Sequence, residues 1–319
     1  MRIIFMGTPE FAVESLSKLV DNGCEVVAVV TMPDKAIGRH HETLQASPVK
    51  QYAVEHGIPV LQPERMKDDA FLEQLRAFRA DLQVVVAFRM LPEVVWAMPP
   101  RGTFNLHAAL LPQYRGAAPI NWAVINGETE TGVTTFFLDH DIDTGRIIHR
   151  VPVPIGPRDN AGDIHDRLMV IGADLVLQTV RDIESGDVQT IEQSSVCGDA
   201  VTTLRPAPKL FRENTEIRWC ELTPTAAYNF IRGLAPYPGA WTTLHTADGR
   251  DTQLKVFDSE LIEDCYPSSA PGNITVDGSR LIVSTLDGAI ALTELQLAGK
   301  RRMSAADFLR GAHLDSAHF

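Results

Sequence analysis

Residues 25–31 read EVVAVVT, a β-branched run that is apolar on both faces of the strand it predicts. A second run of the same kind, DLQVVVA, follows at 81–87. Continuous apolar strands of this type are typical of a parallel sheet that helices cover on both faces. One helical pattern precedes the first run, at 10–21, and two lie between the runs, at 48–56 and 68–78. This part of the chain therefore predicts an α/β fold, a Rossmann-like and mostly parallel sheet with helices on both faces.

The alternation of strands and helices continues to about residue 188. Further strands are predicted at 2–6, 103–106 and 133–138, and further helices at 118–126 and 163–184. Residues 189–208 are polar and contain Pro206 and Pro208, which predicts a linker.

Beyond the linker the pattern changes to short strands separated by turns. One helix is predicted at 225–234, and strands at 241–244, 254–259, 272–276, 280–284 and 289–295. This pattern predicts a small C-terminal β-barrel of OB-like type. We therefore expect a catalytic domain at 1–188, a linker at 189–208 and a second domain at 209–319.

The composition is that of an acidic globular protein. The chain has 319 residues, with 29 Lys and Arg against 41 Asp and Glu, so its formal charge is −12. No run approaches the roughly 20 apolar residues of a membrane-spanning helix, and no signal-peptide pattern is visible. Cys24, Cys197, Cys220 and Cys265 are scattered, which argues against a zinc site. We expect a cytoplasmic protein without membrane contact, and the acidity argues against indiscriminate binding to nucleic acid.

The first strand ends in a turn that does not fit a dinucleotide site. The turn reads MGTPEF, with Gly7 alone where the dinucleotide fingerprint needs a series of glycines. Pro9 falls near the start of the next helix, where its missing N–H costs nothing. The turn therefore predicts a plain strand-to-helix connection.

The residues with the clearest chemistry lie between 105 and 145. Asn105 and His107 are two positions apart at the end of a strand, so their side chains share one face. Asp139, Asp141 and Asp143 follow the next strand, at the carboxyl edge where parallel sheets bind ligands. An Asn amide can donate to an oxyanion, a His can carry a proton, and a carboxylate can orient the His. Together they suit acyl transfer without a covalent intermediate.

Plainer interpretations stay open from spacing alone. Asn105 can cap a turn, His107 can be a satisfied core residue, and the Asp residues can hold a loop or a cation. The alternating Asp residues are similar to the start of a calcium loop, but the bidentate Glu that should follow is missing. We therefore expect no metal.

Several motifs in one order resemble the folate-dependent formyltransferases, and the resemblance covers nearly the whole chain. They are MGTPEFA, PDKAIGR, SPVK, NLHAALLPQYRGAAPI, DHDIDTG, KLFRENTEIRW, LAPYPGAW and GKRRMSAADFLRG. The resemblance implies transfer of a formyl group from 10-formyltetrahydrofolate, as co-substrate, to the α-amino group of methionine on initiator tRNA. The amine would attack directly, without a metal.

The resemblance also assigns roles to single residues. Asn105 matches the Asn that stabilises the oxyanion, His107 the catalytic His, and Asp143 the Asp that positions the His and helps to take the amine's proton. The folate contact maps onto Phe88, Arg89, Met90, Leu91, Ala109, Leu110, Leu111, Pro112 and Asp139. Two departures concern this pocket: Ala109 replaces the usual Ser, and the bulkier Arg89 stands where the family usually has Gly.

Initiator methionyl-tRNA is expected to contact two basic segments. In the family, the loop that matches residues 32–50 enters the acceptor stem, and here it carries Lys35, Arg39, His40, His41 and Lys50. Family members often have two lysines at the histidine positions, so this contact should weaken as the pH rises past neutral. Lys209, Lys300, Arg301 and Arg302 are the candidates in the second domain, with solvated surface charge as the plainer interpretation.

Two alternative functions are kept. The first is a formyltransferase that acts on an amino sugar nucleotide and would not need the basic loop. The second is a catalytically silent folate- or RNA-binding protein, against which the intact Asn105, His107 and Asp143 count. For the leading interpretation we expect a monomer.

Overall fold

The computed structural model covers residues 1–319 and describes all of them except 38–42, 197–202, 248, 263–268, 313 and 315. The chain packs as two units, each of which is discontinuous in sequence. The first consists of Met1–Gly116, Thr131–Pro154 and His165–Ala207, and the second of Ala117–Glu130, Ile155–Ile164 and Pro208–Phe319. Two short internal segments thus pack with the C-terminal part of the chain.

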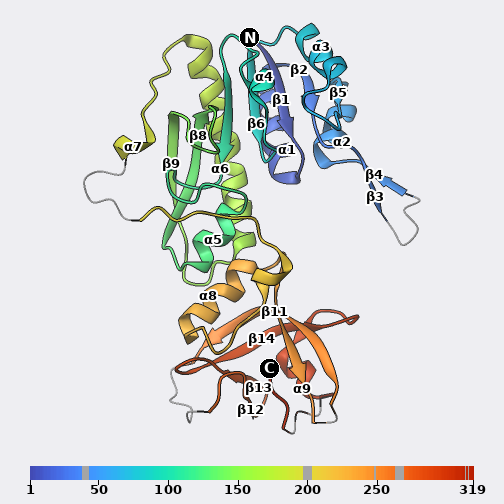
Figure 1. Ribbon diagram of the computed structural model, residues 1–319, viewed down its shortest axis with the longest axis vertical. Coiled ribbons are helices and arrows are strands. Elements are labelled where there is room, and N and C mark those ends of the chain that lie inside the picture. Colours follow the sequence, from blue (N-terminus) through green and yellow to red (C-terminus); the bar gives the residue numbers. More distant parts are fainter. Residues whose placement is uncertain (38–42, 197–202, 248, 263–268, 313, 315) are drawn as a thin grey trace. The chain divides into compact units, whose positions relative to one another are not determined.

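The first unit is built on a mostly parallel sheet (Figure 1). Within the described residues it has seven strands in the order β5-β2-β1-β6-β7-β8-β9. The five from β5 to β7 pair in parallel, and β8 runs antiparallel to β7. The strands are β1 (Arg2–Gly7), β2 (Glu25–Val30), β5 (Val60–Leu61), β6 (Leu82–Val86), β7 (Thr103–His107), β8 (Glu130–Phe137) and β9 (Ile147–Pro154). This confirms the predicted sheet, in which the two apolar runs are β2 and β6.

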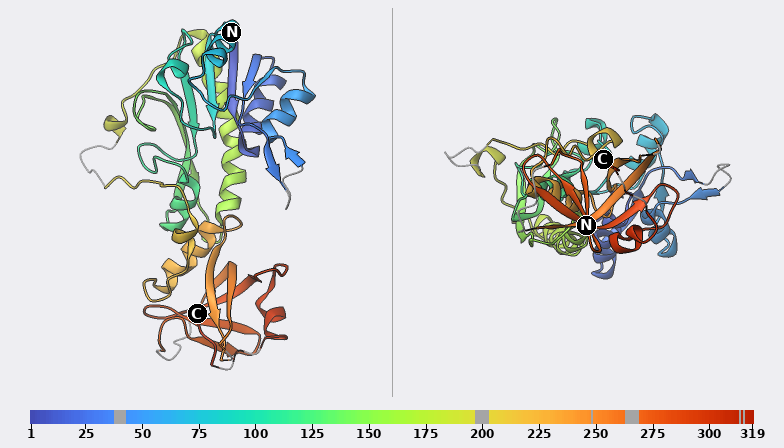
Figure 2. Two further views of the ribbon diagram at one scale, coloured as in Figure 1. Left: turned by 45° about the vertical axis from the view of Figure 1, so that its right-hand side comes forward. Right: turned by 90° about the horizontal axis from the view of Figure 1, so that it is seen from below.

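Helices cover both faces of this sheet, as predicted. On one face Ile4 packs in a buried cluster with side chains of α3 (Asp69–Ala77). On the other face α6 (Ala161–Ser185) lies alongside the strands (Figure 1 and Figure 2). It approaches β7 so closely that a Cβ on Gly172 would stand 2.7 Å from Leu106 Cδ2. None of the helices in the described part of the chain is both long and apolar enough to span a membrane.

The turn after β1 has the predicted form. Pro9 is the N-cap residue of α1 (Glu10–Asp21), with an extended backbone. A Cβ on Gly7 would lie 2.7 Å from the Ala12 Cβ, so a glycine lets the helix approach the strand. Close packing therefore explains this glycine without a nucleotide.

The basic segment 32–50, expected as a loop, contains a two-stranded antiparallel hairpin. β3 (Lys35–Ile37) pairs with β4 (Thr43–Gln45). Strands this short carry too little alternation of apolar residues to be recognised in the sequence. The hairpin leads into α2 (Pro48–Glu55), and Arg39, His40 and His41 lie outside the described residues.

The second unit contains a curled antiparallel sheet, which confirms the predicted barrel-like domain. Its described strands follow the order β10-β11-β14-β13-β12, and β15 pairs with β14. Irregularities in the pairing of β11 with β14, near Val256 and Asp258, favour the bending of the sheet. The strands are β10 (Ala240–His245), β11 (Asp251–Leu261), β12 (Ile274–Asp277), β13 (Arg280–Ser284), β14 (Ala289–Leu297) and β15 (Met303–Ser304).

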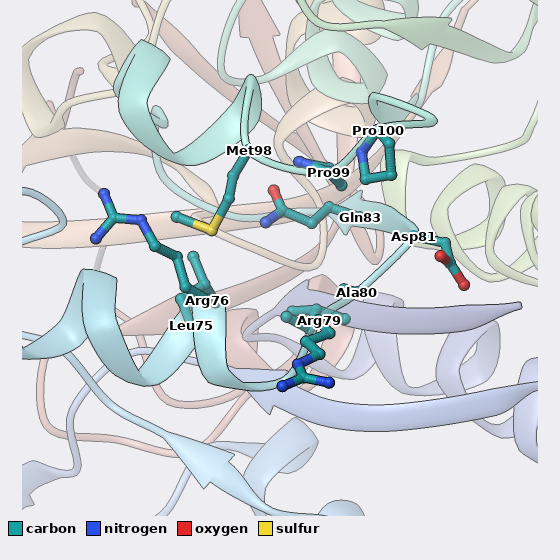
Figure 3. A pocket seen from close by; sticks show the side chains of 10 residues that line it. Leu75, Arg76, Arg79, Ala80, Asp81, Gln83, Met98, Pro99 and Pro100 are labelled. Carbon is teal, nitrogen blue, oxygen red and sulfur yellow. The ribbon is translucent and has the colours of Figure 1, made fainter.

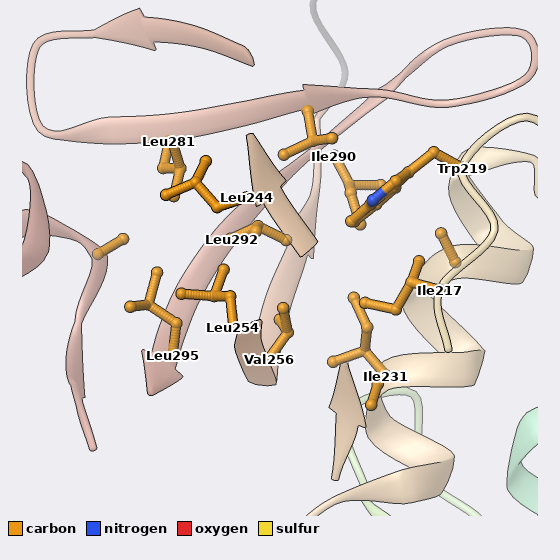
Figure 4. Packing of buried hydrophobic residues seen from close by; sticks show 14 of the residues in the cluster. Ile217, Trp219, Ile231, Leu244, Leu254, Val256, Leu281, Ile290, Leu292 and Leu295 are labelled. Carbon is orange, nitrogen blue, oxygen red and sulfur yellow. The ribbon is translucent and has the colours of Figure 1, made fainter. Parts of the chain in front are cut away.

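The core of the second unit joins this sheet to its helices. Trp219, Ile231 and Leu254 are among the buried side chains that meet there (Figure 4). The indole Nε1 of Trp219 donates to Thr242 Oγ1 at 3.0 Å, so the buried ring keeps a polar partner. The helical elements of this unit are α5 (Pro119–Ile125), η1 (Arg212–Thr215), α8 (Pro224–Leu234) and α9 (Ala305–Leu309). The remaining short helices of the first unit are α4 (Glu93–Trp96) and α7 (Gln193–Val196).

The stability of the second unit should depend on Leu254, whose side chain on β11 is fully buried. Leu254→Ala should lower the free energy of unfolding by roughly 2–5 kcal/mol, because it removes buried apolar surface and leaves a cavity. Urea unfolding followed by tryptophan fluorescence, to which the buried Trp219 of this core contributes, measures this. Leu261→Ala on the same strand is the control, since Leu261 is 48% exposed. Equal midpoints for the two variants would contradict the packing described here.

Candidate active site

The carboxyl end of β7 brings together the first two residues of the site. Asn105 and His107 alternate along the strand and point to the same face of the sheet. Asp143 lies in the loop between β8 and β9, and β8 is the antiparallel neighbour of β7. Because the pairing is antiparallel, this loop leaves the sheet beside Phe104, near the start of β7, and not at the carboxyl edge where the sequence led us to expect it. Asp143 nevertheless lies within 3.8 Å of His107.

His107 stands between a carbonyl group and a carboxylate. Its Nε2 lies 2.8 Å from the main-chain oxygen of Tyr114, and its Nδ1 lies 3.8 Å from Asp143 Oδ2. Because a carbonyl oxygen can only accept, Nε2 carries a hydrogen and donates it to Tyr114. In the neutral ring Nδ1 then has a free lone pair that faces the carboxylate. A single proton can therefore be held between His107 Nδ1 and Asp143.

Burial decides the charge of this histidine. His107 is only 5% exposed, and its loss of hydration lowers the pKa of the imidazole below the usual value for histidine. The Asp143 carboxylate acts against this lowering, and the Arg115 guanidinium adds to it. The ring is therefore neutral at neutral pH, and Asp143 stabilises the imidazolium when a proton arrives.

Both partners of His107 have a left-handed backbone. The φ angles are 60° at Tyr114 and 54° at Asp143. Such a conformation costs a non-glycine residue on the order of 1 kcal/mol or more and persists only where the surroundings impose it. One of these surroundings is Gly116, whose N–H donates to Asp143 Oδ2 at 2.9 Å. Strain of this kind gathers at functional sites, where it holds side chains in a fixed orientation.

Asn105 contributes a buried polar atom without a partner. Among the described residues, none makes a hydrogen bond to its Oδ1. Buried polar atoms are nearly always paired, so an unpaired one at the end of a parallel strand marks a place for a ligand group. The plainer interpretation, an Asn that caps a turn, does not account for this oxygen.

The predicted folate segment Ala109, Leu110, Leu111 and Pro112 is fixed through its main chain. Thr134 of β8 donates its hydroxyl to the carbonyl oxygen of Ala109 at 2.6 Å and accepts the N–H of Leu111 at 3.1 Å. The side chains of Ala109 and Leu111 are fully buried. The segment therefore offers a ligand a rigid main chain, whichever residue occupies position 109.

The second predicted folate segment is held by Arg89. The Arg89 guanidinium donates to the carbonyl oxygens of Glu64 and Pro63, the former at 3.0 Å. Its partial burial lowers the pKa of Arg89. Leu91 is buried, Phe88 is partly buried, and Met90 is 71% exposed. Arg89 thus ties this segment to the residues after β5, and its role at the rim of the pterin pocket stays a prediction.

The acidic loop after β8 is organised by its own residues. Asp139 Oδ1 accepts the N–H of Asp141 at 3.2 Å and the hydroxyl of Thr144 at 2.7 Å. In the described part of the chain, no three His, Cys, Asp or Glu side chains gather as metal ligands do. Asp139 therefore shapes the turn that precedes Asp143, and its contact with folate stays a prediction.

The lysines predicted to contact tRNA in the basic segment have different surroundings. Lys35 is exposed on β3. The Lys50 ammonium lies 2.6 Å from Asp34 Oδ2, and Gln62 also donates to Asp34. Much of the charge of Lys50 is thus balanced within the first unit, which leaves Lys35 as the more accessible cation of the two.

The cations predicted in the second unit are all exposed. The Lys209 ammonium lies 5.3 Å from the ring centre of Phe211, and Phe211 is itself 55% exposed. The Arg302 guanidinium lies 4.3 Å from the ring centre of Phe257 and pairs with Glu294. Lys300 and Arg301 are exposed beside it. An exposed cation beside an exposed aromatic ring suits contact with RNA phosphates and bases.

The sequence did not reveal the residues that fix the catalytic groups through main-chain atoms or from distant positions in the chain. Thr134 has a weak signal, since it is a polar residue in a strand that is otherwise buried. Tyr114 acts through its carbonyl oxygen, which every residue carries. No pattern in the sequence identifies such a role.

A pocket of about 500 Å³ lies away from this site (Figure 3). Its wall includes Asp81 and Gln83 at the start of β6, so it opens at the amino end of the sheet, whereas His107 lies at the carboxyl end of β7. Asp81 already accepts the N–H of Arg2 at 2.7 Å. The pocket therefore plays no part in the chemistry of His107.

Comparison with known proteins identifies the family. The formyl transferase model matches residues 1–180, and the model of the formyl transferase C-terminal domain matches residues 209–313. The methionyl-tRNA formyltransferase of Azobacteroides pseudotrichonymphae is 57% identical over 321 residues, which cover 100% of this chain and 98% of that one. The methionyl-tRNA formyltransferase of Parabacteroides distasonis is 57% identical and covers 98% of this chain and 95% of its own.

Solved structures agree on the fold. The N-formyltransferase of Helicobacter canadensis, in complex with folinic acid and dTDP-3-aminofucose, has a TM-score of 0.62 at 20% identity and covers 91% of this chain and 98% of its own. HypX of Aquifex aeolicus, in complex with tetrahydrofolic acid, has a TM-score of 0.63 at 17% identity, over 97% of this chain and 47% of that one. With both family models matched and more than half of its residues shared with full-length relatives, the chain belongs to the formyltransferase family.

Proposed function

We propose that this enzyme transfers the formyl group of 10-formyltetrahydrofolate to the α-amino group of methionine on initiator tRNA, giving N-formylmethionyl-tRNA for translation initiation. The observation that carries this proposal is the 57% identity, along the full chain, to curated methionyl-tRNA formyltransferases. The geometry around Asn105, His107 and Asp143 suits the chemistry, because it combines an amide with a pair of groups that can hold one proton.

The site has groups that fit a folate co-substrate. The unpaired Oδ1 of Asn105 needs a donor, and the fixed main chain from Ala109 to Pro112 offers a rigid wall beside it. When bound, the folate supplies an activated formyl group, whose carbon is attacked by the amine while its bond to the folate nitrogen breaks. We infer that residues 88–91 and Asp139 complete this pocket.

Asn105 is assigned to the oxygen of the formyl group. As the amine attacks, that oxygen gains negative charge, and the Asn105 amide donates a hydrogen bond to it. A donor fixed before the reaction costs no reorganisation at the moment when charge develops. Asn105 is partly buried on β7, a strand paired on both sides, which limits the movement of this donor.

His107 and Asp143 are assigned to the proton of the amine. The amine loses one proton as its bond to the formyl carbon forms, Asp143 with His107 Nδ1 takes it up, and the same proton passes to the folate nitrogen as its bond to the formyl carbon breaks. His107 suits this role because burial keeps it neutral, and Asp143 stabilises its charged form. The distance of 3.8 Å between the two groups is long for a hydrogen bond, as is common in sites without substrate.

The acceptor tRNA would be bound by both parts of the chain. We propose that Lys35, Arg39, His40, His41 and Lys50 contact the acceptor stem from a catalytic domain at 1–188. Lys209, Lys300, Arg301 and Arg302 would do so from a second domain at 209–319, beyond a linker at 189–208. The extents of the two matched family models support this division. We also propose that the enzyme acts as a monomer in the cytoplasm, where translation takes place.

The alternative acceptor is an amino sugar nucleotide. Its support is the fold shared with the Helicobacter canadensis N-formyltransferase, but at 20% identity the likeness concerns the fold alone. Incubation with 10-formyltetrahydrofolate and either methionyl-tRNA or an amino sugar nucleotide separates the two. We expect formylation of the tRNA. Turnover with the sugar and none with the tRNA would overturn the proposal, and binding without turnover would indicate a silent protein.

Asn105→Ala should lower kcat roughly 10²- to 10³-fold, because it removes a hydrogen-bond donor from the developing oxyanion. The rate of methionyl-tRNA formylation at saturating substrates measures this. Asn22→Ala is the control, since Asn22 is exposed and its side chain forms hydrogen bonds with Lys18 and Arg181, beside α1. A kcat near the wild-type value in Asn105→Ala would remove Asn105 from its assigned role.

Asp143→Asn should lower the pKa of His107 further, because the variant loses the carboxylate that favours the imidazolium. Titration of the histidine ring nitrogens by ¹⁵N NMR measures this without substrate. Asp182→Asn is the matched control, since Asp182 faces a different histidine, His149, at 2.8 Å. An unchanged His107 pKa in Asp143→Asn would show that the carboxylate does not act on the ring.

Arg39→Ala should raise KM for tRNA and reduce the salt dependence of binding, with the log–log slope smaller by roughly 0.7–0.9 for one lost phosphate contact. Titration with methionyl-tRNA at several salt concentrations gives the slope. Arg76→Ala, an exposed arginine on α3, is the control. The overall charge of −12 implies that few cations face the tRNA, so the wild-type slope should itself be modest. An unchanged slope in Arg39→Ala would exclude this contact.

A further inference from the structure

One buried side chain from the polar segment 189–208 reaches the active-site loops. Gln193 opens α7 (Gln193–Val196) and is only 3% exposed, although its neighbours in the sequence are polar and exposed. A long amide side chain in such a position must find partners for both of its polar groups.

The amide nitrogen of Gln193 holds the loop that carries Asp143. Its Nε2 donates to the carbonyl oxygen of Asp143 at 2.8 Å and to that of Gly145 at 2.9 Å. These two bonds use both hydrogens of the amide. They fix the main chain at Asp143, which has a left-handed backbone, and two residues beyond it. The carboxylate of Asp143 faces His107.

The amide oxygen of Gln193 holds the loop on the other side of His107. Its Oε1 accepts from Arg115 Nε at 3.1 Å and Nη2 at 2.6 Å. Arg115 follows Tyr114, the residue whose carbonyl oxygen accepts from His107 Nε2. The two loops that face the two ring nitrogens of His107 are therefore joined through one amide group.

The main chain around Gln193 is anchored independently of this amide. Ile191 exchanges two main-chain hydrogen bonds with Ile147 of β9, at 2.9 and 3.0 Å. Val196 packs against the buried cluster that contains Leu111 and Phe136. A substitution that keeps the size of Gln193 should therefore leave the segment in place and change only the bonds to the loops.

We propose that Gln193 is a positioning residue for formyl transfer, which keeps the Asp143 carboxylate at its working distance from the His107 imidazole. The inference rests on the function proposed above and concerns a residue outside the three that face the reactants. The effect of an orienting group depends on fractions of an ångström. Loss of the hydrogen bonds of Gln193 should therefore lower kcat and leave the affinity for the substrates unchanged.

Two substitutions by residues similar in size to Gln193 test the role of its hydrogen bonds. Gln193→Met keeps the volume and removes every hydrogen bond. Gln193→Glu keeps the acceptor for Arg115 but replaces the two donors by an oxygen that faces the carbonyl oxygens of Asp143 and Gly145. Ser195→Ala is the control in the same helix, because Ser195 is exposed and its hydroxyl donates to the carbonyl oxygen of Glu192, away from the loops of Asp143 and Arg115.

We expect both Gln193 variants to lower kcat by about 10- to 100-fold, with KM for each substrate within about twofold of wild type. Thermal unfolding by circular dichroism checks that each variant is folded. A second measurement needs no substrate: the pKa of His107, followed by ¹⁵N NMR, should fall in Gln193→Met, because Asp143 then acts on the ring from a less favourable position. Among the described residues, the charged groups that act on this ring are Asp143 and Arg115.

Combining Gln193→Met with Asp143→Asn shows through which residue Gln193 acts. If it acts through the carboxylate, most of the fall in the His107 pKa should disappear when that carboxylate is already absent. An equal fall in both backgrounds, or a kcat of wild-type size in folded Gln193→Met and Gln193→Glu, would overturn the inference. Failure of the wild-type enzyme to formylate methionyl-tRNA would instead overturn the proposed function, and the titration of His107 would still decide the role of Gln193.

Discussion

The interaction on which the site depends is the burial of one imidazole ring between a main-chain carbonyl and a carboxylate. Tyr114 fixes the hydrogen on Nε2 of His107, and Asp143 faces the opposite nitrogen. Burial alone would make the ring a weak proton acceptor, because it disfavours the charged form. The carboxylate compensates for part of that loss, so the ring stays neutral before the reaction and can still share a proton during it.

The backbone conformation of the residues that face His107 is energetically unfavourable, and contacts with the surrounding fold stabilise it. Tyr114 and Asp143 both have a left-handed backbone, which their side chains disfavour. The sheet supplies β7 and β8 as rigid neighbours, Gly116 binds the carboxylate, and Gln193 joins the two loops. The described parts of the polar segment 189–208 therefore contact the catalytic loops. In one of these contacts the N–H of Tyr114 donates to the carbonyl oxygen of Arg205.

The sequence predicts the features that local patterns encode. The apolar runs at 25–31 and 81–87 are recognisable because a strand buried on both faces needs apolar residues throughout. The alternation of Asn105 and His107 places both on one face for the same geometric reason. Features that depend on distant residues leave no such pattern: the sequence shows neither the contact of Gln193 with Asp143, fifty positions away, nor the ion pair that occupies Lys50. The β3–β4 hairpin was missed because its strands are too short to establish a period.

A single-turnover experiment shows whether the buried His107 supports transfer of a formyl group to methionyl-tRNA. The wild-type enzyme and the His107→Ala variant are mixed with 10-formyltetrahydrofolate and methionyl-tRNA, and N-formylmethionine is quantified after release from the tRNA. We expect rapid formation of N-formylmethionine by the wild type and a rate lower by roughly 10²- to 10⁴-fold in the variant. Equal rates for the two proteins would contradict this role of His107.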